Sequence, residues 1–263
     1  MHIPSGSTTS DLHSGARRRR LRRALPGLLL LILALLLVPA PAGASYPSPR
    51  PSNEPAAARY QGQVTRIAPG KKRIGLTFDG DAFGGRTGEI IDDLYRYHAK
   101  ATFFLTGKYI EMYPTRSRGL VNSGQEVASH GYKHLDYRDL SDGGIARQLA
   151  AWEATYSWLT GGKHGPPIWR APYGYSTNRV RVVAADSGYR TIYWTLDALD
   201  TVGAPKSASF IFNRLTRPAI NLDGAILLLH VNPPGTIDAL PRVLANLQAR
   251  GLQMVTVSEL LAP

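Results

Sequence analysis

Apolar residues along the chain alternate between short runs typical of buried strands and longer runs with helical periodicity. The short runs predict seven strands, at residues 73–78, 101–106, 126–129, 167–171, 191–196, 225–229 and 254–257. The longer runs predict helices at residues 87–98, 109–123, 142–160, 176–187, 207–219 and 237–250, several of them followed by a glycine that suits a helix end. Strands that alternate with helices predict an α/β fold with parallel strands and right-handed crossovers, either a closed barrel or an open doubly wound sheet. Seven strands favour a distorted, incomplete (β/α)7 barrel that forms a single catalytic domain.

The N-terminal region has the pattern of an export signal. Six arginines between positions 17 and 23 precede an apolar run at residues 28–38, and the small residues of Ala42–Ala44 follow. The run is shorter than the roughly 20 residues that a membrane-spanning helix needs, so we expect cleavage after Ala44 and no membrane span in the mature protein. The prediction is a signal peptide at 1–44, a linker rich in Pro, Ser and Ala at 45–58, and a folded domain at 59–263. The protein is expected to be secreted or associated with the cell wall, and the choice between the general and the twin-arginine export route stays open.

Charge and cysteine content limit the partners and the site chemistry. The formal net charge is +12, of which the six arginines and Asp11 of the signal region contribute +5, leaving +7 for the mature part. A basic extracellular protein suits anionic wall polymers better than nucleic acid, although +7 also fits a merely soluble surface. Cysteine is absent, so a metal site must use histidines and carboxylates. No glycine-rich phosphate-binding pattern follows the first strand, which argues against a nucleotide cofactor.

Polar side chains follow five of the predicted strands at the point where each strand ends. They are Asp79, Asp81, His130, His134, Arg170, Asp197 and His230. The carboxyl ends of parallel strands meet at one edge, so these side chains are expected to lie together. The His130/His134 spacing can place two imidazoles on one metal ion, but alone it fits ordinary solvent-facing or hydrogen-bonded histidines better.

Five short motifs occur in order along residues 73–261. They are LTFDGD at 76–81, HGYKH at 130–134, RAPYG at 170–174, WTLDALD at 194–200 and LLLH at 227–230. Together they resemble the polysaccharide deacetylases of carbohydrate esterase family four, and the resemblance covers nearly the whole predicted domain. It implies the incomplete barrel already favoured by the strand count.

The resemblance also implies a division of labour for hydrolysis of an acetyl group. Asp79 would be the general base and His230 the general acid, while Arg170 would orient Asp79 and Asp197 would orient His230. The backbone amide of Tyr173 would stabilise the oxyanion.

The same resemblance implies a metal centre. His130 and His134 would hold a divalent cation, with Zn²⁺ in first place and Co²⁺ as the alternative. The chain departs from the family here, because Gly80 stands where the family has its ligand aspartate. Asp81 is our expected replacement, since alternate residues of an extended segment face the same side, but Asp81 capping a turn and a site of two histidines with waters stay open. Gly131 also replaces a Ser or Thr of the second motif.

The predicted function is metal-dependent hydrolysis of N-acetyl groups from amino sugars of a peptidoglycan or chitin-like polysaccharide, with release of acetate. The acetylated glycan is the expected partner, and nucleic acid is not. Two alternatives are an O-acetyl polysaccharide esterase, which would use the same machinery, and a pseudoenzyme that binds glycan without cleaving it.

Overall fold

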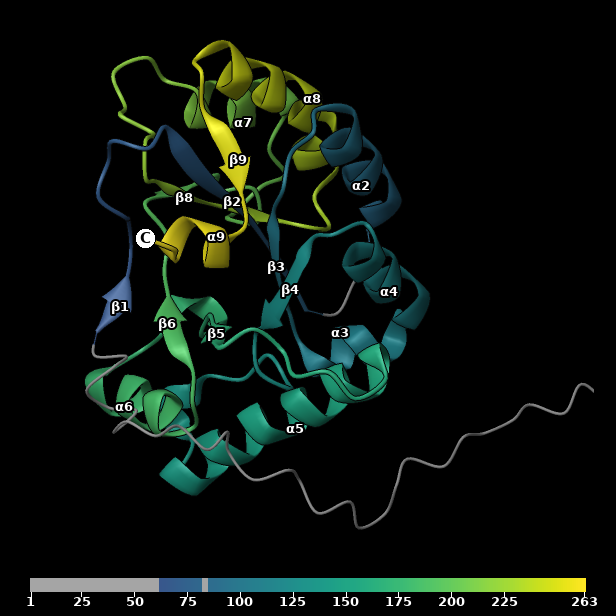
Figure 1. Cartoon of the computed structure of the whole chain (residues 1–263), viewed down its shortest axis with the longest axis vertical. Helices are drawn as coiled ribbons and strands as arrows, with labels where there is room; N and C mark the ends of the chain where they lie inside the picture. Colours follow the sequence, from purple (N-terminus) through teal and green to yellow (C-terminus); the bar gives the residue numbers. More distant parts are fainter. Residues whose placement is uncertain (1–61, 82–84) are drawn as a thin grey trace, which may run out of the picture. The chain divides into compact units, whose positions relative to one another are not determined.

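The computed structural model describes residues 62–81 and 85–263, which form an α/β fold around a curved parallel sheet (Figure 1). Its strands are β1 (Gln63–Val64), β2 (Arg73–Gly80), β3 (Thr102–Leu105), β4 (Glu126–Ser129), β5 (Ile168–Trp169), β6 (Arg190–Ile192), β7 (Leu196–Asp197), β8 (Ile226–His230) and β9 (Gln253–Val255). Their order is β1-β6-β5-β4-β3-β2-β8-β7, with β9 paired to the start of β2. All of these strand pairs are parallel, which confirms the predicted α/β class and the incomplete barrel.

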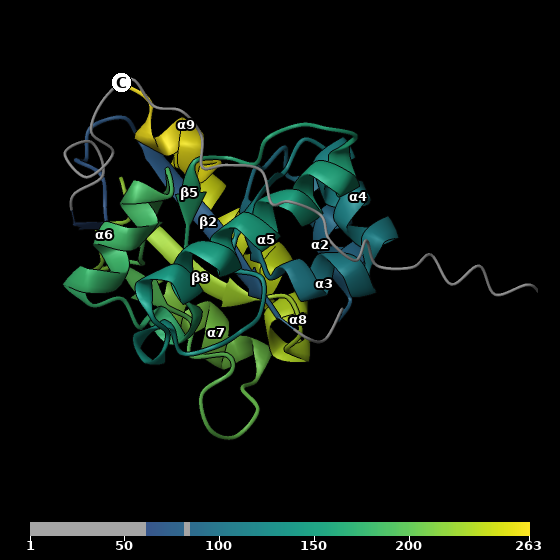
Figure 2. The ribbon, with the colours of Figure 1, turned by 90° about the horizontal axis from the view of Figure 1, so that it is seen from below.

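Helices cover the outside of this sheet. They are α2 (Thr87–Arg96), α3 (Gly107–Met112), α4 (Pro114–Asn122), α5 (Asp142–Thr160), α6 (Asn178–Asp186), α7 (Ala208–Leu215) and α8 (Pro234–Ala249). The short helix α9 (Val257–Leu261) packs against the opposite face. The turned view places β2 and β8 near the middle of the fold with helices around them (Figure 2). No helix in these residues combines the length and the apolar composition that crossing a membrane requires.

Local sequence explains most element boundaries. Ser141 begins α5 by accepting a hydrogen bond from the Gly144 amide, and Gly161 ends it in the left-handed conformation with φ 71°. The predicted helix at 109–123 is instead two helices, because Pro114 begins a new helix after the break at Tyr113. The predicted strand at 191–196 is likewise divided between β6 and β7, and β1 was not predicted.

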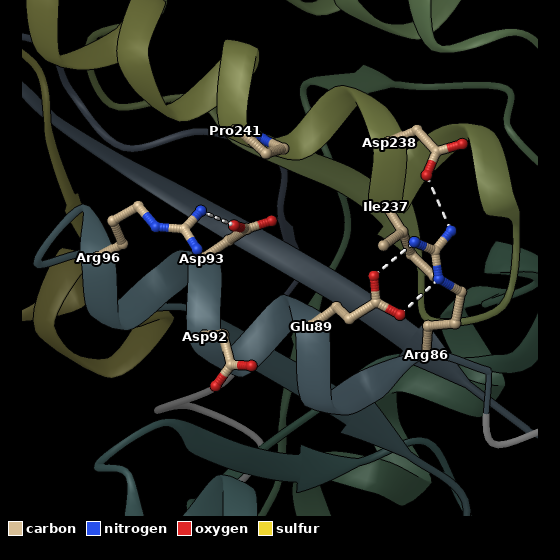
Figure 3. Close-up of a pocket in the computed structure, with 8 residues that line it drawn as sticks. All are labelled: Arg86, Glu89, Asp92, Asp93, Arg96, Ile237, Asp238 and Pro241. Atoms are coloured by element: carbon tan, nitrogen blue, oxygen red, sulfur yellow. Dashed lines mark hydrogen bonds and ion pairs between the residues drawn. The ribbon is translucent and has the colours of Figure 1, made fainter.

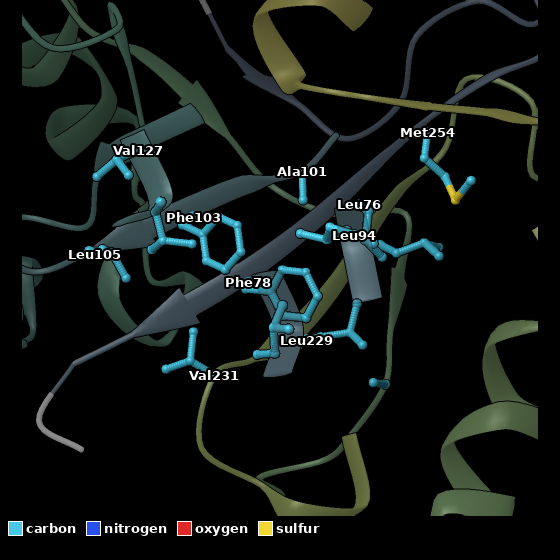
Figure 4. Close-up of a cluster of buried hydrophobic side chains, with 14 of the residues drawn as sticks. Leu76, Phe78, Leu94, Ala101, Phe103, Leu105, Val127, Leu229, Val231 and Met254 are labelled. Carbon is cyan, nitrogen blue, oxygen red and sulfur yellow. The ribbon is translucent and has the colours of Figure 1, made fainter. Parts of the chain in front are cut away.

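The two faces of the sheet bury different sets of apolar side chains. On the face covered by the helices, Phe78 and Phe103 stack with ring centroids 5.0 Å apart, beside Leu105 and Leu229 (Figure 4). On the opposite face, Phe104 packs in a second cluster with residues of α9. Because side chains alternate along a strand, Asp79 and His230 follow outer residues and therefore belong to the inner face.

The predicted signal peptide and linker, and the first residues of the predicted domain, lie outside the residues that the structure describes.

Candidate active site

Four predicted site residues lie at carboxyl ends of neighbouring strands. Asp79 and His230 are register partners on β2 and β8, while His130 follows β4 and Arg170 follows β5. The β5–β4–β3–β2–β8 order brings their strand ends to one edge of the sheet. The structure therefore unites residues that are up to about 150 positions apart in the sequence.

Asp79 forms a buried ion pair with Arg170. Arg170 Nη1 donates to Asp79 Oδ1 over 2.7 Å, and the two residues are 0% and 5% exposed. Arg170 also donates to Thr77 Oγ1 over 2.8 Å and to the Tyr193 carbonyl over 3.0 Å. Burial alone would raise the pKa of Asp79, but the charge and hydrogen bond of Arg170, together with the charges of His130 and His230, outweigh it and leave this pKa below the ordinary value. The carboxylate is thus ionised, and its orientation agrees with the predicted role of Arg170.

His130 is a buried neutral imidazole. Its Nδ1 lies 2.9 Å from the carbonyl of Arg170, and since a carbonyl can only accept, Nδ1 is the protonated nitrogen. Nε2 is then the nitrogen with a lone pair, and it lies 3.8 Å from Asp79 Oδ2. Burial lowers the pKa of His130 to about 4. A histidine with Nδ1 bound to a backbone carbonyl and a free Nε2 has the usual state of a metal ligand.

His134 lies beside His130 at the more open side of the site. Their ring centroids are 5.1 Å apart. Burial lowers the pKa of His134, and the negative charges of Asp81 and Asp79, which act to raise this pKa, do not offset the effect of burial. The ring of Tyr173 meets His134 edge-on with centroids 4.3 Å apart. Tyr173 itself is 55% exposed and has a left-handed backbone with φ 59°, an uncommon conformation for a bulky residue.

The carboxylate that orients His230 is Asp200. His230 Nδ1 donates to Asp200 Oδ1 over 2.8 Å, and Asp200 Oδ2 accepts from the His230 amide and from Thr236 Oγ1 over 2.8 and 2.6 Å. Burial would lower the pKa of His230, but the hydrogen bond and charge of Asp200 raise it above the ordinary value. Asp197 was predicted for this contact, and that prediction is corrected. Its Oδ1 instead accepts from the Leu199 amide over 2.7 Å.

His130 and His134 lie together, as the metal-ligand prediction expects, and their ligand role stays a prediction. His130 and His134 are neutral and adjacent, as ligands must be, whereas residues 62–81 and 85–263 contain no group of three His, Asp or Glu side chains placed to hold a metal ion. A Cβ on Gly80 would lie 2.8 Å from Leu105 Cδ2 and 3.1 Å from Val231 Cγ2. Position 80 therefore faces the apolar outer side of β2. The ligand role of Asp81 stays a prediction.

Sequence reasoning missed three residues that hold the site together. Asp200, Thr236 and Thr77 bind His230, Asp200 and Arg170, respectively. The second aspartate of WTLDALD was a visible signal for Asp200. The sequence contains no comparable signal for the two threonines, because their role depends on which strand or helix lies opposite them.

Gly131 is required by the packing beneath the histidine loop. Its φ is 75°, and a Cβ there would lie 1.8 Å from the hydroxyl oxygen of Tyr137. The buried Tyr137 side chain occupies the space that a side chain at position 131 would need. The departure in the second motif thus has a local structural cause.

A separate hollow lies between α2 and α8, away from these strand ends (Figure 3). Arg86 donates to both Glu89 and Asp238 there, with Nη1 2.8 Å from Asp238 Oδ1. Arg96 pairs with Asp93 over 2.7 Å. Apart from the buried Asp93, these charges are exposed and paired with one another, which is typical of a solvated helix surface.

Comparison with known proteins agrees with the fold and with the family resemblance. A sequence model described as polysaccharide deacetylase matches residues 66–192. A peptidoglycan-N-acetylglucosamine deacetylase of Bacillus cereus is 28% identical over 191 residues, covering 71% of this chain and 67% of that protein. An uncharacterised 30.6 kDa protein of Geobacillus stearothermophilus is 31% identical over 193 residues, covering 73% of this chain and 72% of the relative. The sequence and the fold match those of a polysaccharide deacetylase domain. The chain belongs to the polysaccharide deacetylases of carbohydrate esterase family four.

One set of similar solved structures bears on activity. A pseudoenzyme of this family from Bacillus anthracis superposes with a TM-score of 0.70 at 28% identity, covering 77% of this chain and 69% of that chain. A mutant of the same protein, described as having restored enzymatic activity, superposes equally well at 29% identity, covering 77% and 72%. The fold is therefore common to active and inactive relatives, so the fold by itself does not decide activity.

Proposed function

We propose that this chain removes N-acetyl groups from amino sugars of a peptidoglycan or chitin-like glycan and releases acetate. The observation that carries the proposal is the pairing of Asp79 with His230 across β2 and β8, each bound to its own partner of opposite charge. One group is ionised as a base and the other is kept protonated as an acid. Amide hydrolysis needs both states at one site.

Asp79 is the proposed general base. Its depressed pKa keeps it ionised at neutral pH, and Arg170 holds one carboxylate oxygen, Oδ1. The other oxygen, Oδ2, lies on the side of His130. From there Asp79 would accept the proton of the water that attacks the acetyl carbon.

His230 is the proposed general acid. An amine leaves an amide only when it is protonated, and the raised pKa of His230 supplies an imidazolium near neutral pH. Asp200 binds Nδ1, so Nε2 is the nitrogen that would give its proton to the leaving amine. His230 retains 26% side-chain exposure, which leaves it open to a substrate.

Tyr173 is proposed to donate its backbone amide to the oxyanion. The turn Pro172–Gly174 carries this residue in the left-handed conformation, a strained arrangement of the kind that positions backbone groups at active sites.

A divalent cation, with Zn²⁺ preferred over Co²⁺, is proposed to bind His130 and His134, with Asp81 as a third ligand. When bound, the cation makes water more acidic and polarises the acetyl carbonyl. The negative charge of Asp81 acts on His134, which supports its placement on that side of the site.

The N-terminal arginines and apolar run, together with relatives named as peptidoglycan deacetylases, support a secreted or wall-associated, extracytoplasmic protein. The mature protein is proposed to lack a membrane span.

A glycan-binding pseudoenzyme is the second candidate. Gly80 removes the family's ligand carboxylate, and the pseudoenzyme relative has the same fold. The retained Asp79–Arg170 and His230–Asp200 pairs favour the enzyme, because binding alone requires neither a base nor an acid.

The test is acetate release by the mature protein from N-acetylglucosamine oligomers, peptidoglycan and O-acetylated xylan. Assays include a chelator, add-back of Zn²⁺ or Co²⁺, and the variants Asp79→Asn, Asp81→Ala and, as an exposed control, Asp92→Ala. We expect acetate release from the N-acetylated glycans. The chelator and Asp79→Asn should abolish this release, and Asp92→Ala should leave it intact. Loss with Asp81→Ala would support the third ligand. Release from xylan alone would favour the esterase, and glycan binding without any release would favour the pseudoenzyme.

A further inference from the structure

The backbone between Asp197 and Asp200 makes an unusual turn. Leu199 has φ 55°, in the left-handed region that glycine adopts readily and leucine rarely does. The Leu199 amide donates to Asp197 Oδ1 over 2.7 Å. This bond is the kind of local side-chain contact that stabilises a tight turn. The residue that follows the turn is Asp200, whose carboxylate is fully buried against His230.

The start of this turn is attached to the strand that carries His230. Leu196 and Asp197 form β7, which pairs with β8, and the Ala198 amide donates to the Leu228 carbonyl over 2.9 Å. Arg214 Nε donates to the backbone carbonyl of Asp197 over 2.5 Å. The backbone of Asp197 is thus held from both sides, and only the turn separates it from Asp200.

We propose that Asp197 is a positioning residue, whose carboxylate holds Leu199 in the left-handed conformation and thereby places Asp200 on His230. Without the turn, an extended or helical Leu199 would direct Asp200 away from the end of β8. Thr236 then completes the arrangement by donating to Asp200 over 2.6 Å. The inference rests on the proposed function only for the role of His230 as the acid.

A different role for Asp197 would be purely electrostatic. The negative charges of Asp200, Asp79 and Asp197 all favour the imidazolium form of His230. Asp197→Asn separates the two roles, because the amide oxygen still accepts from the Leu199 amide while the charge is gone. Leu199→Gly separates them in the other direction, because glycine adopts the turn without the carboxylate.

The experiment is an NMR titration of the His230 imidazole in the mature protein, with the resonance assigned by its loss in His230→Gln. The proteins compared are wild type, Asp197→Asn, Asp197→Ala, Leu199→Gly and the double variant Asp197→Ala/Leu199→Gly. We expect a small fall of the His230 pKa in Asp197→Asn, where only the charge is lost, a larger fall in Asp197→Ala, and recovery to the level of Asp197→Asn in the double variant. Acetate release should follow the same order, with a loss of about tenfold or more in kcat/KM for Asp197→Ala.

Two results would overturn the inference. One is an equal fall of the His230 pKa in Asp197→Asn and Asp197→Ala, and the other is a failure of Leu199→Gly to restore it. If Asp197→Ala does not fold, the double variant is compared with Leu199→Gly alone, and a difference between these two larger than the fall in Asp197→Asn contradicts the proposal. The titration needs no turnover, so it decides this inference even if no acetate release is found.

Discussion

Asp79 and His230 are register partners on the adjacent parallel strands β2 and β8, and each is bound by a different charged side chain. Arg170 binds Asp79 from the end of β5, whereas Asp200 binds His230 from the turn after β7. The two titrating groups thus have separate anchors. Each anchor can therefore be removed separately, while the opposite charges of Asp79 and His230 also act on each other.

The pH dependence assigned to the acid should follow Asp200. The pKa of His230 is raised in the folded state, so its contribution to stability is full below the unfolded pKa and is lost as pH rises through the folded pKa. Asp200→Asn should remove this contribution and move the alkaline limb of kcat to lower pH. Thermal unfolding and kcat measured across pH 5–9, a range of about two units either side of neutrality, test this. Asp92→Asn is the exposed control, and an unmoved alkaline limb in Asp200→Asn would show that His230 does not set it.

The buried ion pair should be sensitive to removal of one partner. Arg170→Met leaves Asp79 buried without its countercharge, and we expect a loss of about 3–5 kcal/mol in the free energy of unfolding. Arg170→Lys should lose less stability, because it keeps the positive charge. Some stability should still be lost, because lysine lacks the guanidinium group that reaches both Asp79 and Thr77. Urea unfolding provides the measurement.

The Asp79–Arg170 pair also predicts how the stability of the protein changes at acidic pH. Because the folded pKa of Asp79 is lowered, its contribution to stability is present above the unfolded pKa and is lost as pH falls through the folded pKa. Arg170→Met should abolish this contribution, and the double variant Asp79→Asn/Arg170→Met should recover part of the stability. A single Arg170→Met variant as stable as wild type would refute the prediction.

Restoring the family's residue at position 131 should destabilise this protein. Gly131→Ser combines a left-handed backbone with a clash against Tyr137, for which we expect a loss of about 2–5 kcal/mol in the free energy of unfolding. Gly161→Ser is the matched control, since its φ is 71° but nothing lies within 4 Å of the added Cβ. Tyr137→Leu should relieve part of the loss at Gly131. Equal effects at Gly131 and Gly161 would mean that packing against Tyr137 is unimportant.

A carboxylate restored at position 80 should not create a metal ligand. Gly80→Asp would direct its side chain towards Leu105 and Val231, and burial of an unpaired carboxylate there should cost about 3 kcal/mol or more beyond Gly80→Ala. Calorimetric titration with Zn²⁺ is expected to give no gain in affinity. Tighter binding without loss of stability would instead show that the end of β2 can turn to present residue 80 to the histidines.

The sequence alone predicted the α/β class and the positions of most strands, and it indicated the candidate site residues. Each strand is a local apolar run, and Asp79, Arg170 and His230 follow such runs directly, so no long-range information was needed to select them. The division of residues 191–196 between two strands was not visible, because β6 and β7 pair at opposite edges of the sheet. The two-residue β1 is too short to leave a periodic signal.

The tertiary structure decided which side chains meet at the site. Asp197 and Asp200 are the same residue type and lie three positions apart, so the sequence does not distinguish them as partners of His230. Only the left-handed turn at Leu199 brings Asp200 rather than Asp197 to His230. Position 80 faces the helices because β2 continues through Gly80, and Gly131 is required because Tyr137 packs beneath it. Local patterns determine where strands and helices form. Side-chain partners depend on backbone direction and on neighbours distant in sequence, and those arise only when the sheet is assembled.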